Sequence, residues 1–133
     1  MPSTTTKIST RRHKQVLDIT DRVQQAVSES GVQSGLCNIF VTHTTAGITT
    51  GESIEGTDED LMEVLERLIP EIKFRHEHDP SHAPDHMISS ILGPSVTVPI
   101  RNGKLQLGTW QSVLFVECNG PRERNVVITM VPT

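Results

Sequence analysis

Histidine and acidic side chains are concentrated in residues 76–86, which read His-Glu-His-Asp-Pro-Ser-His-Ala-Pro-Asp-His. The segment holds four of the six histidines of the chain, with two aspartates and one glutamate between them. Imidazole and carboxylate groups are common ligands of zinc, manganese and iron, and they are also the usual general acids and bases. The alternative interpretation is a solvated loop in which the histidines have no common task. Residues 76–86 are therefore a candidate catalytic or metal-binding segment.

A second polar segment, residues 43–52, directly follows a strongly apolar run. It reads His-Thr-Thr-Ala-Gly-Ile-Thr-Thr-Gly-Glu, so hydroxyl groups, one imidazole and two glycines occur together. Hydroxyl groups and exposed backbone N–H groups suit a bound phosphate or sulfate. The alternative is a threonine-rich strand in which His43 only caps a turn. We expect a small-anion site here, because polar residues at the end of a strand often form small-molecule sites.

The composition predicts one globular domain spanning residues 1–133. Hydrophobic residues make up 35% and charged residues 21% of the chain, which is typical of a soluble protein able to bury a core. One Trp, three Phe and no Tyr leave few aromatic rings for stacking on bases. The net charge of −4 also argues against binding to a phosphate backbone. We therefore expect no nucleic-acid partner, and we expect the Ser/Thr-rich residues 1–6 to be disordered.

Cys37 and Cys118 both lie inside apolar runs, not in CxxC or paired-loop patterns. We interpret both as reduced, buried thiols; a disulfide or a nucleophile is the alternative. No stretch approaches the ~18 consecutive apolar residues of a membrane span, and the polar beginning of the chain does not resemble a secretory signal. These features predict a cytoplasmic protein with no membrane partner.

Helices are expected over residues 20–30, 57–68 and 84–92, each with apolar residues at helical spacing and with Gly or Pro soon after its end. The apolar residues of the second and third helices are expected to be buried; they are Leu61, Val64, Leu65, Leu68, Met87, Ile88, Ile91 and Leu92.

Strands are expected over residues 7–19 (one or two strands), 36–42, 95–100, 104–107, 110–118 and 125–131. The hairpins of the last third, including the one at Asn102-Gly103, are too short for parallel crossovers. The order of elements therefore predicts an α+β fold of mostly antiparallel, sandwich-like sheets with two or three short helices.

Several motifs occur in an order that resembles one known family. They are His-Thr-Thr-Ala at 43–46, the helix 61–68 with Pro70 after it, the block ending at His86, Leu-Gly-Pro-Ser at 92–95, Gly-Lys-Leu at 103–105, Leu-Gly-Thr-Trp-Gln at 107–111 and Gly-Pro-Arg at 120–122. Together they resemble the YjbQ family, once named UPF0047, from about residue 15 onward. The Gly-Thr-Trp-Gln motif, followed by an apolar strand that ends in an acid and then Gly-Pro-Arg, is a specific combination.

The resemblance implies an α+β fold built on antiparallel sheet and assembly as a homotrimer. Family members have been described as secondary thiamine-phosphate synthases, which join a pyrimidine diphosphate to a thiazole phosphate and release pyrophosphate. The polar cluster of the family would correspond here to His43, Thr44, Thr45, Glu52, His76, Asp79, His86, Trp110, Gln111, Glu117 and Arg122. This chain has His82-Ala83 where relatives often have Asn-Ala, and Gly51-Glu52 where they often have Asn-Glu.

These residues divide into three expected roles, with a small phosphorylated molecule as the expected partner. The candidate catalytic groups are His43, Glu52, Asp79 and His86. The candidate substrate- or anion-binding groups are Thr44, Thr45, Trp110, Gln111 and Arg122. The candidate ligands of a divalent metal (zinc, manganese or magnesium) are His43, His76, His86 and Glu117. Three further histidines are interpreted as bystanders: His78 and His82 on the same loop, and His13 on a solvated basic face.

Alternatives stay open for single residues and for the whole chain. Arg122 could instead pair with Glu123 at the surface, and Trp110 could be a core residue. The chain could be a metal-dependent phosphate-ester hydrolase, in which case a metal restores turnover to stripped protein. It could also be a non-enzymatic trimer that binds a small anion or metal, in which case a ligand stabilises the protein without turnover.

Overall fold

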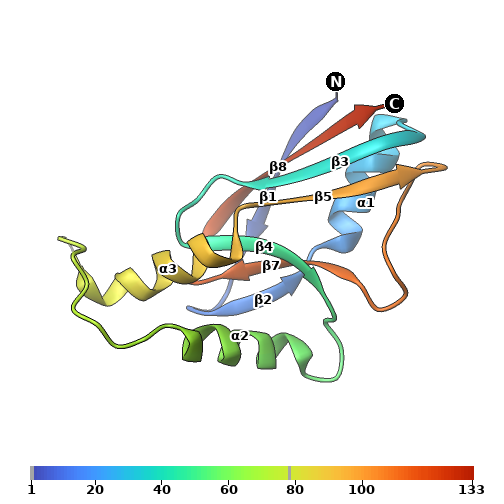
Figure 1. The fold of residues 1–133 in the computed structure, drawn as a ribbon. Helices are drawn as coiled ribbons and strands as arrows, with labels where there is room; N and C mark the ends of the chain where they lie inside the picture. Colours follow the sequence, from blue (N-terminus) through green and yellow to red (C-terminus); the bar gives the residue numbers. More distant parts are fainter. Residues whose placement is uncertain (1, 78) are drawn as a thin grey trace.

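The computed structural model describes residues 2–77 and 79–133, so Met1 and His78, the latter interpreted above as a bystander, lie outside the described residues. The helices are α1 (Thr20–Ser30), α2 (Thr57–Leu68) and α3 (Ala83–Leu92), and the 3-10 turn η1 (Pro80–His82) leads into α3. The strands are β1 (Ser3–Ser9), β2 (Gln15–Asp18), β3 (Ser34–Val41), β4 (Ala46–Gly51), β5 (Ser95–Arg101), β6 (Lys104–Leu105), β7 (Ser112–Glu117) and β8 (Glu123–Pro132). The predicted α+β class is confirmed (Figure 1).

The strands form two antiparallel sheets with a common core. One sheet has five strands in the order β1-β8-β3-β5-β6, and the other has three in the order β2-β7-β4. The main core lies between them and includes Ile39 of β3, Phe115 of β7 and Ile128 of β8, with Val23 and Val27 of α1. Buried and exposed residues alternate along β3, because successive side chains of a strand point to opposite faces. One face of the larger sheet is thus in the core.

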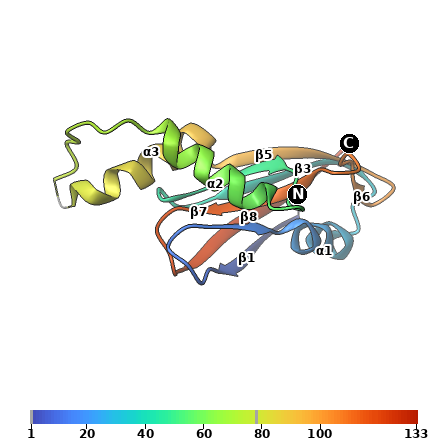
Figure 2. The same cartoon turned by 90° about the horizontal axis from the view of Figure 1, so that it is seen from below.

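The smaller sheet is covered on both faces, as β7 shows. Residues 113–117 are all buried. Phe115 belongs to the main core, whereas Val116 belongs to a second cluster with Met62 and Leu65 of α2 and Ile88 of α3. Helices α2 and α3 therefore pack on the face of the smaller sheet that is turned away from the larger one (Figures 1 and 2).

The predicted burial of the apolar residues of α2 and α3 is correct only in part. Leu65 and Ile88 are buried, but Val64, Leu68 and Ile91 are 54%, 62% and 65% exposed, and Met87 is also exposed. The apolar stripe of each helix is wider than the surface that a three-stranded sheet can cover, so helical spacing alone overestimates burial. Among the described residues, no helix has the length and apolar character needed to cross a membrane.

The predicted disorder of residues 1–6 is wrong for residues 3–6, which belong to β1. This strand pairs with β8 from Ser3 opposite Thr129 to Ser9 opposite Glu123. β-branched threonines suit an edge strand with one side in solvent, so a polar segment becomes ordered through backbone pairing. Similarly, residues 46–51 form β4, whereas residues 42–45 form the loop before it and Glu52 follows its end. The threonine-rich strand offered as the alternative for residues 43–52 is therefore correct for most of that segment.

Candidate functional site

A polar cavity of about 460 Å³, here called the anion cavity, lies where the ends of four strands meet. β3 and β8 are neighbours with Val41 opposite Val126, and β4 and β7 are neighbours with Ala46 opposite Glu117. The loops that follow β3 and β7 therefore lie together, and η1 and α3 contribute the remaining wall. The lining residues are Thr42, His43, Thr44, Thr45, His82, His86, Asn119, Arg122 and Arg124.

The lining is cationic and rich in hydrogen-bond donors. It combines two arginines and three histidines with four neutral polar residues, and no carboxylate is among the described residues that line it. Guanidinium groups donate in a geometry that matches phosphate, and hydroxyl, amide and imidazole groups can donate to the same anion. The lining can therefore hold a small, multiply charged anion.

Arg124, which lines the anion cavity, forms a buried ion pair with Glu117 beneath the lining. They are 3% and 0% exposed. Arg124 Nε donates to Glu117 Oε1 at 2.8 Å, and Arg124 Nη2 donates to Glu117 Oε2 and, at 2.9 Å, to Thr45 Oγ1. The carboxylate also accepts from the Thr10 hydroxyl at 2.8 Å and from the Asn119 backbone N–H at 3.1 Å. The carboxylate of Glu117 therefore accepts four hydrogen bonds, two of them from Arg124.

The protonation of Glu117 follows from the same contacts. Burial by itself raises its pKa, but the hydrogen bonds from Arg124, Thr10 and Asn119, together with the charge of Arg124, outweigh this effect and leave the pKa below its ordinary value of 4.5. The carboxylate is therefore ionised at neutral pH and compensates the charge of Arg124. The uncompensated positive charge of the anion cavity lies on Arg122.

Arg122 is an exposed residue held in place at the edge of the anion cavity. Its backbone N–H donates to Thr10 Oγ1 at 2.9 Å, and its Nε donates to the Asn119 carbonyl at 2.8 Å. The Nε bond orients the guanidinium plane, while the two Nη atoms carry its other four N–H donors. Glu123, the alternative partner considered from the sequence, lies 3.7 Å from Lys7 Nζ on the neighbouring strand.

His43 is a neutral hydrogen-bonding group in this arrangement. Its Nε2 accepts the backbone N–H of Asn125 at 2.8 Å, so the neutral ring carries its proton on Nδ1. Burial lowers the pKa of His43, and the charges of Arg124 and Arg122 lower it further against the opposing effect of Glu117. At neutral pH the ring therefore donates from Nδ1, and Nε2 is already used.

The histidine segment brings His82 and His86 to the anion cavity. The ring of His86 stacks on that of His76 with centroids 5.0 Å apart. His82 Nε2 lies 3.3 Å from Asp79 Oδ2, and hydrogen bonds from Ser81 lower the pKa of Asp79, so this acid is ionised beside the imidazole. His82, interpreted above as a bystander, thus lines the anion cavity, because η1 turns it toward the strand ends.

Six of the expected site residues do not line the anion cavity. His76, Asp79 and Glu117 contact residues that do, whereas Glu52, Trp110 and Gln111 lie apart from it. Gln111 Nε2 donates to Thr50 Oγ1 at 3.1 Å, and Glu52 lines a separate hollow of about 380 Å³ beside α2. Trp110 is 67% exposed and precedes β7, which begins at Ser112, so it is neither a core residue nor part of the strand predicted over 110–118. The smaller sheet and α2, not the loops at the cavity, position Glu52, Trp110 and Gln111.

The expected metal ligands are divided among different contacts. Within residues 2–77 and 79–133, no group of three or more His, Cys, Asp or Glu side chains is placed to hold a metal ion. His43 and Glu117 make the hydrogen bonds described above, whereas His76 and His86 stack on each other. Metal binding therefore stays a prediction.

Besides His82, three lining residues, Thr42, Asn119 and Arg124, were not singled out from the sequence as site residues. For Arg124 a signal was present, because positions 124, 126, 128 and 130 of β8 share the buried face. An arginine on a buried face requires a buried acceptor, preferably a carboxylate. The acid that ends the apolar strand β7, Glu117, is such a partner.

Comparisons with known proteins agree with the resemblance seen in the sequence. The family model described as UPF0047 protein YjbQ-like matches residues 4–133. A UPF0047 protein of Archaeoglobus fulgidus is 38% identical over 122 residues, which cover 91% of this chain and 94% of the relative. The UPF0047 protein YugU of Bacillus subtilis is 38% identical over 131 residues, which cover 96% and 97%. The crystal structure of a hypothetical protein from Aeropyrum pernix K1 matches with a TM-score of 0.93 at 36% identity, covering 100% of both chains. The chain therefore belongs to the UPF0047 family of YjbQ-like proteins.

Proposed function

We propose that this chain is an enzyme of small-molecule phosphate chemistry that resembles the secondary thiamine-phosphate synthases, with the anion cavity as its active site. The observation that carries the proposal is the lining of this cavity: two arginines, three histidines and several hydroxyl groups, with no lining carboxylate among the described residues. Such a lining favours a multiply charged anion over a cation, even on a chain with net negative charge. A diphosphate ester has the required charge.

Release of a diphosphate leaving group depends mainly on charge stabilisation, with little covalent work for the protein. In the proposed reaction the carbon–oxygen bond to the diphosphate breaks, the thiazole nitrogen supplies the electron pair for the new carbon–nitrogen bond, and pyrophosphate departs. Arg122 would donate two parallel hydrogen bonds to phosphate oxygens, and His43 Nδ1 and the hydroxyl of Thr44 would add further donors. These interactions strengthen as negative charge accumulates on the leaving group, and this lowers the barrier.

His82 would act as a proton donor to the departing pyrophosphate, and His86 would do so when it holds no metal. An imidazole titrates close to neutral pH and can therefore give up a proton to a phosphate oxygen. The carboxylate of Asp79, 3.3 Å from His82 Nε2, is placed to orient that ring at the cavity. In this proposal Asp79 positions His82 and does not touch the substrate.

A divalent ion would act together with the diphosphate. His76 and His86 would supply imidazole ligands for zinc or manganese, whereas magnesium would be held through diphosphate oxygens. Elemental analysis of purified protein beside His86→Ala tests this part. About one metal ion per chain that is lost in the variant supports it; no metal after incubation with zinc and manganese contradicts it.

The anion site itself is tested by titration with inorganic pyrophosphate. Arg122→Ala removes the uncompensated guanidinium, and we expect its affinity for pyrophosphate to fall by about tenfold or more, as for loss of a charged hydrogen bond. Arg101→Ala is the matched control, because Arg101 is an exposed arginine at the end of β5. Equal affinity of all three proteins would refute the anion site.

Turnover is tested by following pyrophosphate release from the pyrimidine diphosphate with and without the thiazole phosphate. Release that requires the thiazole phosphate and is lost in His86→Ala supports the synthase. Release without it indicates a phosphate-ester hydrolase that uses the same cavity. Tight pyrophosphate binding with no turnover of either substrate would identify a binding protein and refute the enzyme proposal.

A further inference from the structure

A second cavity, here called the Asp85 cavity, has a volume of about 470 Å³. It lies at the connection between α2 and α3, which extends beyond the ends of the sheets in Figures 1 and 2. Its walls are mostly apolar and include Ile69, Ile72 and Phe74 of this connection and Ile88 of α3. None of the described residues lines both this cavity and the anion cavity, so variants of one cavity can be tested without changing the lining of the other.

The two cavities lie against different sides of the first turns of α3. His82 and His86 are four residues apart, lie on one side and line the anion cavity. Pro84, Asp85 and Ile88 line the Asp85 cavity, because the helical repeat of 3.6 residues turns them away from the two histidines. A ligand in the Asp85 cavity would therefore contact the same helix without touching the anion site.

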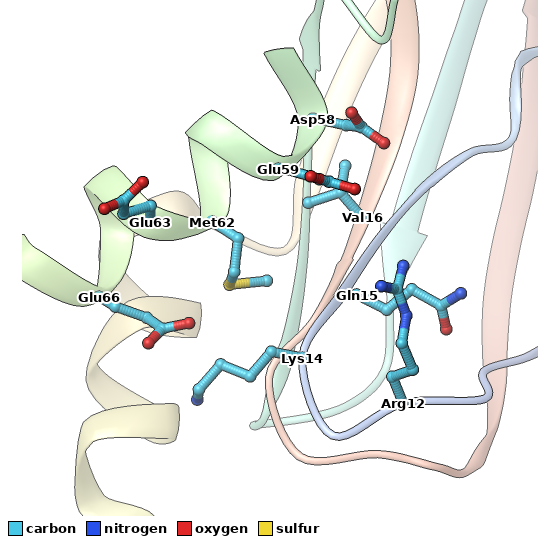
Figure 3. Close-up of a pocket in the computed structure, with 9 residues that line it drawn as sticks. All are labelled: Arg12, Lys14, Gln15, Val16, Asp58, Glu59, Met62, Glu63 and Glu66. Carbon is cyan, nitrogen blue, oxygen red and sulfur yellow. The ribbon is translucent and has the colours of Figure 1, made fainter. Parts of the chain in front are cut away.

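A buried ion pair forms the base of the Asp85 cavity. Asp85 is only 3% exposed. Its Oδ1 accepts a hydrogen bond from Lys14 Nζ, which also donates to the Cys118 carbonyl at 3.1 Å. Figure 3 shows Lys14 in the adjoining hollow, extending from the segment before β2 alongside Met62 and Glu66 of α2. These two bonds use two of the three N–H donors of the ammonium group, and the third can serve a ligand.

The other oxygen of Asp85 is unusual. Oδ2 is buried and has no hydrogen-bond partner in the part of the chain that the structure describes. His13 Nε2 is 3.7 Å away, which is too far for a hydrogen bond. A buried carboxylate oxygen without a donor is rare, because nothing compensates its lost hydration. The side chain of His13 is 55% exposed, so it can give up its place to the donor group of a ligand.

We propose that the Asp85 cavity binds a small amino-substituted aromatic heterocycle. The amino group would donate to Asp85 Oδ2, and a neighbouring ring nitrogen would accept from Lys14 Nζ. The ring faces would contact Ile72, Phe74 and Ile88, in keeping with the mixture of apolar walls and few polar groups that is typical of small-molecule sites.

The first test compares 4-aminopyrimidine with 4-methylpyrimidine, which has a similar shape and the same ring nitrogens but lacks the amino donor. Binding to the full chain is followed by chemical-shift changes or calorimetry. We expect 4-aminopyrimidine to bind about tenfold or more tightly, as for a hydrogen bond to a charged group. In Asp85→Asn the acceptor becomes an amide, and we expect the preference to disappear. Equal binding of the two compounds to the unmodified protein would overturn the proposal.

A second pair of variants keeps the test decisive even where Asp85→Asn fails to fold. Ile72→Ser removes an apolar wall at a residue that is 59% exposed, so the fold should tolerate it. Leu68→Ser is the matched control, with 62% exposure and no place in the lining. We expect Ile72→Ser to weaken 4-aminopyrimidine binding severalfold, and Leu68→Ser and Arg122→Ala to leave it unchanged. Loss of binding in Arg122→Ala would place the compound in the anion cavity and refute this site.

Discussion

At the scale of single residues, the Glu117–Arg124 pair supports the lining of the anion cavity. Removing two charges from water costs several kcal/mol for each ion, and a buried pair recovers this only with very good geometry and further hydrogen bonds. Here the guanidinium contacts both carboxylate oxygens, and Thr10 and Asn119 supply two more donors. The pair is therefore more important for holding β7, β8 and the loop at Thr45 in one arrangement than for net stability.

Glu117→Gln is expected to lower the free energy of unfolding by about 3–5 kcal/mol, because it leaves the buried charge of Arg124 without its partner. Urea denaturation of the purified variant measures this. The control is Glu123→Gln, which removes a carboxylate that is 60% exposed and 3.7 Å from Lys7 Nζ and should change the stability by less than about 0.5 kcal/mol. Equal stability of the two variants would show that the buried pair is not held as described.

The free energy of unfolding should depend on pH in acidic solution because Glu117 becomes protonated there. Its pKa is depressed in the folded state relative to the ordinary 4.5, so its stabilising effect is fully present above pH 4.5 and is lost as the pH falls through the lower folded value. We expect the stability difference between the unmodified protein and Glu117→Gln to be constant from pH 7 to pH 5 and to shrink in more acidic solution. Urea titrations at each pH measure it, and a difference that grows on acidification would contradict the assigned direction.

At the scale of elements, the anion cavity depends on how connections between strands are held together. The β7–β8 turn packs against the residues that follow β1, where the Thr10 backbone N–H donates to the Arg122 carbonyl and the Arg122 N–H donates to Thr10 Oγ1. Helix α3 is held to the start of β4, where Ser89 Oγ donates to the Ala46 carbonyl at 2.6 Å. These contacts place Arg122 and His86 at one cavity although neither residue belongs to a strand.

Gly120 lies where the β7–β8 turn passes closest to the segment after β1. A Cβ atom there would be 2.3 Å from the Arg12 carbonyl oxygen and 2.9 Å from Glu117 Cγ, so Gly120→Ala must displace the turn. We expect a loss of about 1–3 kcal/mol in stability, as for other overpacked sites, and weaker pyrophosphate binding because Arg122 moves. Gly108→Ala is the control, since a Cβ there meets nothing closer than 3.6 Å. Unchanged melting and binding in Gly120→Ala would refute this account.

At the scale of the whole molecule, one face of the larger sheet is uncovered in the single chain. Leu36 and Phe40 of β3 are 42% and 41% exposed on this face, and their neighbours on β8 are Val131 and Val127. Large apolar side chains gathered on one surface often mark a contact between proteins. We propose that this face is the subunit contact of the homotrimer that the family resemblance implies.

The trimer is tested by light scattering coupled to size-exclusion chromatography. We expect three chains per particle for the unmodified protein and a monomer for the double variant Leu36→Glu, Phe40→Glu, because two charges would be buried without partners in the contact. Val64→Glu is the control, a charge placed on the exposed side of α2. Dissociation by Val64→Glu but not by the β3 double variant would indicate that the helices, not the larger sheet, form the subunit contact. A monomeric unmodified protein would refute the trimer.

Local patterns in the sequence determined the fold class and the positions of the helices and of most strands. The Asn102-Gly103 hairpin is an example, because both residues have positive φ, 52° and 73°, as the turn type requires. Apolar periodicity likewise located the helices, since it reflects the 3.6-residue repeat of each helix on its own. Periodicity did not indicate how much of each apolar stripe the smaller sheet would cover, because that depends on the width of another element.

Only the tertiary structure decided which polar residues meet. Thr10 and Glu117 are hydrogen-bonded although 107 positions separate them, and this contact follows from strand pairing and from the path of the β7–β8 turn. The same long-range packing made Glu117 a structural partner of Arg124, brought His82 to the anion cavity and left Glu52, Trp110 and Gln111 outside it. Residue types can suggest a chemistry from the sequence alone. The site is decided by distances of a few ångströms between segments, which no local pattern encodes.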